Sequence, residues 1–194
     1  VALAWLVAAY LGVSRSYGFW RSIGAIIDLL PRPGSYLIAD NSALLEWIGR
    51  EVDVPYRWEH QMFAGFGALA LAVAGVAWGR HAVPGLAATM LAALALLIAL
   101  TLYADGVSLY LLLARLPGVE GIRAVGRIVL VMLLPLAVLA ALGAEAIWRR
   151  FGRSMPGAAG LLAALALLVV IEPLSVRVTA TPIAEWRSRL AALR

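Results

Sequence analysis

Long apolar runs alternate with short polar stretches along the chain, and the runs are long enough to predict membrane-spanning helices. Crossing about 30 Å of hydrocarbon takes about 20 apolar residues in a helix, because lipid offers no partners to backbone polar groups. Four runs with at most one charge qualify: residues 61–79, 82–104, 128–148 and 154–171. A shorter apolar run, residues 1–13, predicts a partial transmembrane helix whose beginning has been cut off. We therefore expect an all-α fold, a polytopic transmembrane helix bundle.

Composition excludes several classes of protein. Of the 194 residues, 63% are hydrophobic and 14% are charged, whereas a soluble domain is about 45–50% apolar and about 25% charged. A soluble enzyme and a disordered chain are therefore excluded, and the lack of cysteine excludes disulfides and thiol chemistry. The net charge of +5 is spread over small clusters between apolar runs, which is typical of membrane-protein loops. We therefore expect no nucleic-acid partner.

Arginine in the short connections predicts the topology. Residues 79–81 and 149–153 form short basic connections that we place in the cytoplasm. The other face then receives the loop of residues 14–60, the loop of residues 105–127 and the tail of residues 172–194. All the basic residues are arginine, and alanine, leucine, valine and glycine are abundant, which favours a GC-rich bacterial genome. We predict a multi-pass protein of the bacterial cytoplasmic membrane whose long loop and tail are extracytoplasmic.

The outer segments themselves contain apolar patterns. Residues 17–30 predict an amphipathic interfacial helix, because their large apolar side chains fall on one helical face. A second short helix is expected over residues 43–49 after Asn41, a good N-cap residue. Residues 107–116 are nearly all apolar but too few to span, so they predict a surface-lying or re-entrant helix.

Two arginines at the outer mouth of the third full span are candidates for anion binding. Arg123 and Arg127 are four residues apart and therefore lie on one helical face. Two guanidinium groups placed in this way could grip a phosphate or pyrophosphate. The alternative is that both extend to lipid headgroups, as arginines near helix ends commonly do.

Further polar candidates lie on the outer face. Glu59 and His60 precede a span and could form a metal or acid–base pair, but the chain has two histidines and no metal-ligand spacing, so we predict no metal site. Asp40 fits turn or capping chemistry better than a catalytic base, and Asp105 marks a helix end. Glu172 stands before a proline at the exit of the last span, with its carboxylate expected at the membrane interface.

Four stretches taken together resemble the C-terminal half of bacterial membrane proteins of the GT-C glycosyltransferase superfamily. They are residues 59–65 (EHQMFAG), residues 116–127 (LPGVEGIRAVGR), the Leu-Ala-Gly-rich residues 139–143, and residues 171–174 (IEPL) followed by residues 181–183 (TPI). The resemblance covers nearly the whole chain. It departs at Val125, where the family commonly has a proline between two arginines.

The resemblance implies sugar transfer from a polyprenyl-phosphate donor to an extracytoplasmic acceptor, with the catalytic carboxylate in a loop that precedes this chain. It also implies phosphate contacts at Arg123 and Arg127. No cofactor is predicted for these residues, and a divalent metal would belong to the missing part. Two alternatives stay open: a transporter or flippase segment, and a non-catalytic structural subunit of a membrane-protein complex. The uncharged runs 82–104 and 154–171 disfavour transport, because transporters place polar groups near the bilayer midplane.

Overall fold

The chain folds predominantly into α-helices. A computed structural model describes residues 2–18, 22–79, 85–116, 119, 125–152 and 157–175. Within these ranges the helices are joined by turns and short 3₁₀ segments, and the β-structure is confined to an isolated bridge between Ala104 and Val107. The expected all-α class is therefore confirmed for the described part of the chain.

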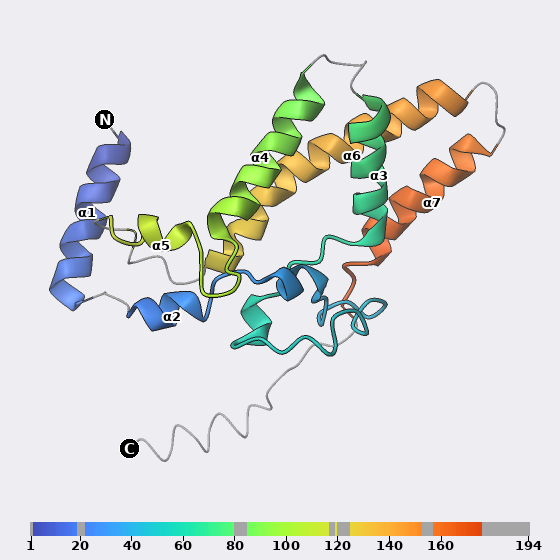
Figure 1. The fold of residues 1–194 in the computed structure, drawn as a ribbon. Coiled ribbons are helices and arrows are strands. Elements are labelled where there is room, and N and C mark those ends of the chain that lie inside the picture. The colour runs from blue at the N-terminus through green and yellow to red at the C-terminus, as the bar shows by residue number, and fades with distance from the viewer. Residues whose placement is uncertain are drawn as a thin grey trace, which may run out of the picture.

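Four apolar helices form a bundle around α6 (Figure 1). They are α3 (Phe66–Trp78), α4 (Leu86–Thr101), α6 (Val129–Phe151) and α7 (Ala158–Ile171), and α6 contacts each of the other three. Helices α3 and α6 run in one direction while α4 and α7 run in the other. The end of α3, the beginning of α4, the end of α6 and the beginning of α7 consequently lie at one end of the bundle, and a layer of turns and short helices covers the opposite end.

Glycine allows α3 and α6 to approach backbone to backbone. A Cβ added to Gly143 would stand 1.8 Å from the carbonyl oxygen of Leu71, and one added to Gly75 would stand 2.0 Å from that of Leu139. On the neighbouring face of α3, a Cβ on Gly67 would meet the α7 backbone at Val169 at 2.9 Å. Close packing through small residues is typical of membrane helices. Gly67 and Gly75 therefore allow close helix packing.

One helix reaches membrane-spanning length. Residues Val125–Phe151 comprise the 3₁₀ segment η5 (Val125–Ile128) and α6, and a window of this 27-residue helix has a mean hydropathy of 2.5. At 1.5 Å per residue it is about 40 Å long, enough for the hydrocarbon core of a bilayer. The apolar helices α3, α4 and α7 have 13, 16 and 14 residues. The four expected spans therefore correspond to one helix of spanning length and three shorter apolar helices.

This layer of turns and short helices, the polar layer (residues 31–65), differs in its secondary structure from the prediction. Residues 43–50 form successive turns instead of the helix expected over residues 43–49. Gly49 has a φ of 68°, in the left-handed region, and the residue that caps the first turn is Ser42, whose Oγ accepts the N–H of Leu45. The remainder of the layer holds two 3₁₀ segments, η1 (Pro33–Leu37) and η2 (Arg57–Glu59).

The apolar residues 17–30 also depart from a single interfacial helix. Helix α1 (Ala2–Tyr17) extends beyond the partial span expected over residues 1–13 and is followed by Gly18, whose φ is 61°. The next described helix is α2 (Ile23–Ile27). Its apolar face is covered only in part, because Ile26 and the following Leu30 are buried against Tyr110 and Val125 while Ile23 is exposed.

Tyr110 begins the short helix α5 (Tyr110–Leu113), the only helical part of the described residues in the stretch 107–116. This stretch was expected to form a longer surface-lying or re-entrant helix. Its buried residue Tyr110 packs against α2, so the two short helices support each other beside the end of the bundle.

Candidate functional site

Glu172 is a buried link between three segments. It is only 4% exposed. Its Oε1 and Oε2 accept the N–H groups of Phe66 and Gly67, each at 3.1 Å, in the first turn of α3. A carboxylate at a helix N-terminus satisfies orphan donors and complements the helix dipole. The Ser42 hydroxyl donates to the Glu172 carbonyl oxygen at 2.5 Å, so Glu172 joins the end of α7 to α3 and to the polar layer.

His60 is a fully buried histidine with both ring nitrogens engaged. Its Nε2 lies 3.0 Å from the carbonyl oxygen of Asp28, which accepts only, so Nε2 carries the hydrogen. Nδ1 then accepts from the Ser35 hydroxyl at 2.8 Å, while the Ser35 oxygen itself accepts the N–H of Arg32 at 2.8 Å. Burial lowers the pKa of His60, so the ring stays neutral and holds the polar layer together.

Asp40 makes a two-pronged ion pair with an arginine. The Nε of Arg57 donates to Oδ2 at 2.7 Å, and Nη2 donates to Oδ1 at 2.8 Å. The same guanidinium donates to the carbonyl oxygens of Gly49 and Val52, so it fastens a loop of the polar layer. Asp40 raises the pKa of Arg57, which stays charged. This arrangement agrees with a turn-stabilising role for Asp40 and leaves its carboxylate engaged.

Glu59 and Arg127 meet at the rim between the polar layer and the bundle. Arg127 Nη2 lies 3.4 Å from Glu59 Oε1, and its side chain is 68% exposed while that of Glu59 is 18% exposed. The two backbones are also in contact, since a Cβ on Gly126 would stand 2.6 Å from the Glu59 carbonyl oxygen. The expected partner of Arg127, Arg123, lies outside the described residues.

Asp105 sits in a tight exposed turn after α4. Asp105 and Gly106 have φ values of 49° and 84°, and the flanking Ala104 and Val107 exchange backbone hydrogen bonds of 3.0 and 2.9 Å. Positive φ at both central residues is the pattern of a type I′ turn, which favours Asp-Gly. The helix itself ends at Thr101, so Asp105 marks a chain reversal just beyond the helix end.

A cavity of about 690 Å³ lies where α3, α6 and the end of α7 meet the polar layer. Its α6 wall is one helical face on which two leucines are followed by four alanines, at a spacing of three or four residues. This wall comprises Leu133, Leu136, Ala137, Ala140, Ala141 and Ala144. Opposite stand Ala64, Ala68 and Leu71, with Val169 from α7. Because alanine side chains are short, the alanines on the two opposite walls leave a cavity between the helices.

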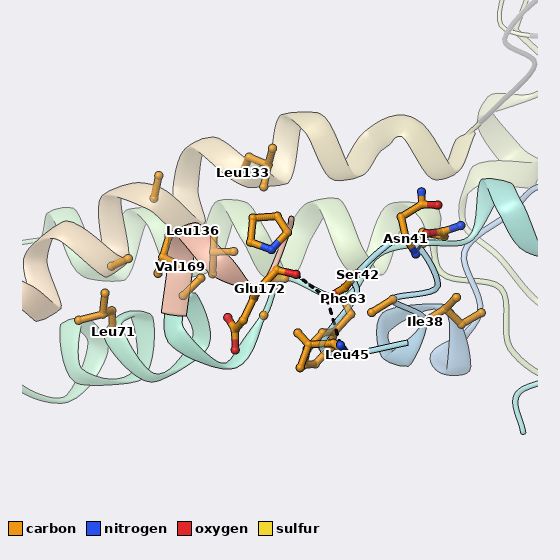
Figure 2. Close-up of a pocket in the computed structure, with 18 of the residues that line it drawn as sticks. Ile38, Asn41, Ser42, Leu45, Phe63, Leu71, Leu133, Leu136, Val169 and Glu172 are labelled. Carbon is orange, nitrogen blue, oxygen red and sulfur yellow. Dashed lines mark hydrogen bonds between the residues drawn. The ribbon is translucent and has the colours of Figure 1, made fainter. Parts of the chain in front are cut away.

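The polar end of the cavity is formed by the loop segments. Asn41, Ser42, Gln61 and Glu172 line it, and no side chain in its described lining is basic. Figure 2 shows Leu71, Leu136 and Val169 on one side of Glu172 and Asn41 on the other. The Oε1 of Gln61 accepts the N–H of Asn41 at 3.1 Å, which joins the two loop segments. The cavity is therefore apolar along the bundle and polar at its outer end.

The structure brings few of the sequence candidates together. Glu59 and Arg127 are paired, and Glu172 lines the cavity, whereas Asp40, His60 and Asp105 each have a separate local role. Sequence reasoning missed the cavity and its amides Asn41 and Gln61. The alanine spacing on residues 137–144 was the one signal that pointed to it.

Among the described residues, no group of three or more histidine, aspartate or glutamate side chains is placed to hold a metal ion. Comparison of the chain with protein-family models, with curated proteins and with solved structures finds no match.

Proposed function

We propose that the chain forms a polytopic membrane bundle of a glycosyltransferase-like protein, which transfers a sugar from a polyprenyl-phosphate donor to an extracytoplasmic acceptor. In this proposal α3, α4, α6 and α7 cross the bacterial cytoplasmic membrane. Large apolar side chains on their outer surfaces support a lipid environment, because soluble monomers rarely expose contiguous apolar surface of this kind. Examples are Leu96, Leu130, Leu134 and Val170, with exposures of 65%, 66%, 69% and 62%.

The antiparallel order of the helices supports the orientation. The ends of α3 and α6 lie at the same end of the bundle, where Arg149 and Arg150 at the end of α6 are exposed. Arginine near short loops favours the cytoplasmic side. The polar layer, with the ion pairs of Asp40 and Glu59, then lies at the extracytoplasmic surface.

The observation that carries the proposal is the exposed guanidinium of Arg127 at the boundary between bundle and polar layer. Its pair with Glu59 is long and solvent-exposed, and such pairs contribute at most about 1 kcal/mol. A phosphate can therefore displace the carboxylate and accept charge-assisted hydrogen bonds from the guanidinium. In sugar transfer the same cation would stabilise the departing lipid phosphate.

The reaction also needs a base to activate the acceptor hydroxyl. His60, Asp40 and Glu172 are committed to structural hydrogen bonds, so none of these three is proposed for the role. We assign the base to a carboxylate outside the described residues, as the family resemblance implies. In this proposal Arg127 contacts the phosphate of the donor, and other groups bind and activate the acceptor hydroxyl.

Polyprenyl-phosphate binding to the purified protein in lipid nanodiscs tests this role. Arg127→Ala should weaken binding about tenfold or more, because a charge-assisted hydrogen bond to phosphate contributes about 1.5–3 kcal/mol. Arg50→Ala is the matched control, since the Arg50 side chain is 66% exposed and pairs with Glu46 at 4.0 Å. Wild-type affinity in Arg127→Ala, or an equal loss in Arg50→Ala, would refute the proposed phosphate contact.

A further inference from the structure

The cavity beside α6 has a chemistry of its own, distinct from the phosphate contact at Arg127. We propose that it binds a neutral amphiphile, with a hydrocarbon chain along the bundle and an uncharged, hydroxyl-bearing head group at the polar end. Arg127 does not belong to its lining. The inference depends on the proposed function only for the membrane setting, and not on the sugar-transfer step.

The apolar part of the cavity fits a hydrocarbon chain. Its volume of about 690 Å³ lies within the range of about 300–1,000 Å³ found for small-molecule sites. The α6 wall from Leu133 to Ala144 and the α3 wall around Ala68 carry no hydrogen-bonding side chain. A hydrocarbon chain of the ligand in this part of the cavity would be stabilised by burial of its methylene groups. Each buried methylene group contributes about 0.8 kcal/mol of transfer free energy.

The polar end offers both donors and acceptors to hydroxyl groups. Each carboxylate oxygen of Glu172 accepts one backbone N–H and retains a lone pair for a hydroxyl donor. The Gln61 side chain uses its oxygen on the N–H of Asn41, so its amide N–H₂ remains a donor. The Asn41 side chain is exposed at the same end and supplies a further amide. A sugar or glycerol head group matches this mixture.

The charge of the lining selects against anions. Among the described residues that line the cavity, the one ionisable side chain is the carboxylate of Glu172, and none is basic. A phosphate head would therefore bring like charges together in a half-enclosed, low-dielectric site without a compensating cation. The ligand of the cavity therefore differs in charge from a polyprenyl-phosphate donor.

Photolabelling with two probes tests the inference on the purified protein in phosphatidylcholine nanodiscs. The probes are a dodecyl maltoside and a dodecyl phosphate that carry the same photoreactive diazirine in the chain. The maltoside should label residues 133–144 saturably, and the phosphate should label them at least about tenfold less at equal concentration. Equal labelling by the phosphate overturns the neutral head group. If the maltoside probe gives no saturable labelling, the proposed binding site is refuted. This outcome includes the case in which another part of the protein fills the cavity.

Two variants tie the labelling to the cavity. Ala137→Phe places a ring in the cavity and should reduce maltoside labelling about tenfold, whereas Ala164→Phe on the exposed surface of α7 should leave it unchanged. Asn41→Arg, at an exposed position of the cavity lining, should raise labelling by the phosphate probe. Unchanged labelling in both Ala137→Phe and Asn41→Arg overturns the inference. Arg127→Ala should not alter maltoside labelling, so this test and that of the proposed function fail independently.

Discussion

The carboxylate of Glu172 stands where a side chain on Gly65 would stand, because a Cβ on Gly65 would lie 2.5 Å from Glu172 Oε2. Gly65 also has a φ of 88°, which glycine adopts without strain. This contact fastens the end of α7 to the beginning of α3, and the same two residues line the cavity. The stability of the bundle and the shape of the polar end therefore depend on one pair of residues.

Gly65→Ala should destabilise the protein by about 2 kcal/mol or more, because the new methyl group adds a clash to backbone strain. In a Glu172→Ala background the added cost should fall, since the clash disappears while the strain remains. A double-mutant cycle of unfolding free energies measures this coupling. Strictly additive losses would show that the two residues are not in contact.

Glu172→Ala by itself should lower the free energy of unfolding by about 1–3 kcal/mol, because two backbone N–H groups at the start of α3 lose their acceptor. Glu145→Ala is the control. Glu145 is also paired, with Arg149 four residues later, but its side chain is 46% exposed. Its removal should cost at most about 0.5 kcal/mol. Equal costs in the two variants would argue against the buried cap.

Gly143→Ala should separate α3 from α6. The added Cβ would stand 1.8 Å from the Leu71 carbonyl oxygen, a backbone atom that cannot move without shifting the helix. We expect a loss of about 3 kcal/mol or more by thermal unfolding. Gly160→Ala in α7 is the matched control, because nothing lies within 4 Å of its added Cβ. That change should be neutral or stabilise by up to about 1 kcal/mol.

His60 should make stability depend on mild acidity. Burial lowers its pKa in the folded protein below the ordinary value of 6.5, so in the window between the two values the unfolded chain binds a proton that the folded chain does not. The contribution of neutral His60 is thus complete above pH 6.5 and is lost as the pH falls below it. Unfolding midpoints measured from pH 7.5 to 5 should decline less steeply in His60→Gln. Parallel slopes would contradict a buried neutral ring.

The positions of the bundle helices were predictable because an apolar run of sufficient length is a local signal. The start of α3 was not. The apolar run of residues 61–79 is continuous, but residues 61–65 lie outside the helix. The helix begins at Phe66, where Glu172, distant in sequence, accepts two backbone N–H groups. Similarly, the apolar face of residues 17–30 predicted a helix lying in the membrane interface, whereas Ile26 and Leu30 pack against Tyr110, which is distant in sequence.

The candidate site was predictable only in part. Spacing placed Arg127 at the beginning of a helix, but its pairing with Glu59 depends on how the polar layer folds back on the bundle. His60 was singled out because histidine adjoins glutamate, whereas its actual partners, Ser35 and the Asp28 carbonyl, are far away in sequence. Contacts between residues that are distant in sequence leave no periodic pattern in the chain. The sequence therefore indicated which polar residues were candidates, but not which residues they contact.

The membrane crossing underlies both proposals, and accessibility of single cysteines tests it most directly, because the chain has no native cysteine. Asp53→Cys in the polar layer, Leu96→Cys on α4 and Arg150→Cys at the far end of α6 are all exposed positions. With a membrane-impermeant maleimide on cells with an opened outer envelope, Asp53→Cys should react at once. Arg150→Cys should react only after the cytoplasmic membrane is permeabilised, and Leu96→Cys should stay unlabelled in lipid. Labelling of Asp53→Cys and Arg150→Cys from the same side, or ready labelling of Leu96→Cys, would contradict a bundle that crosses the membrane.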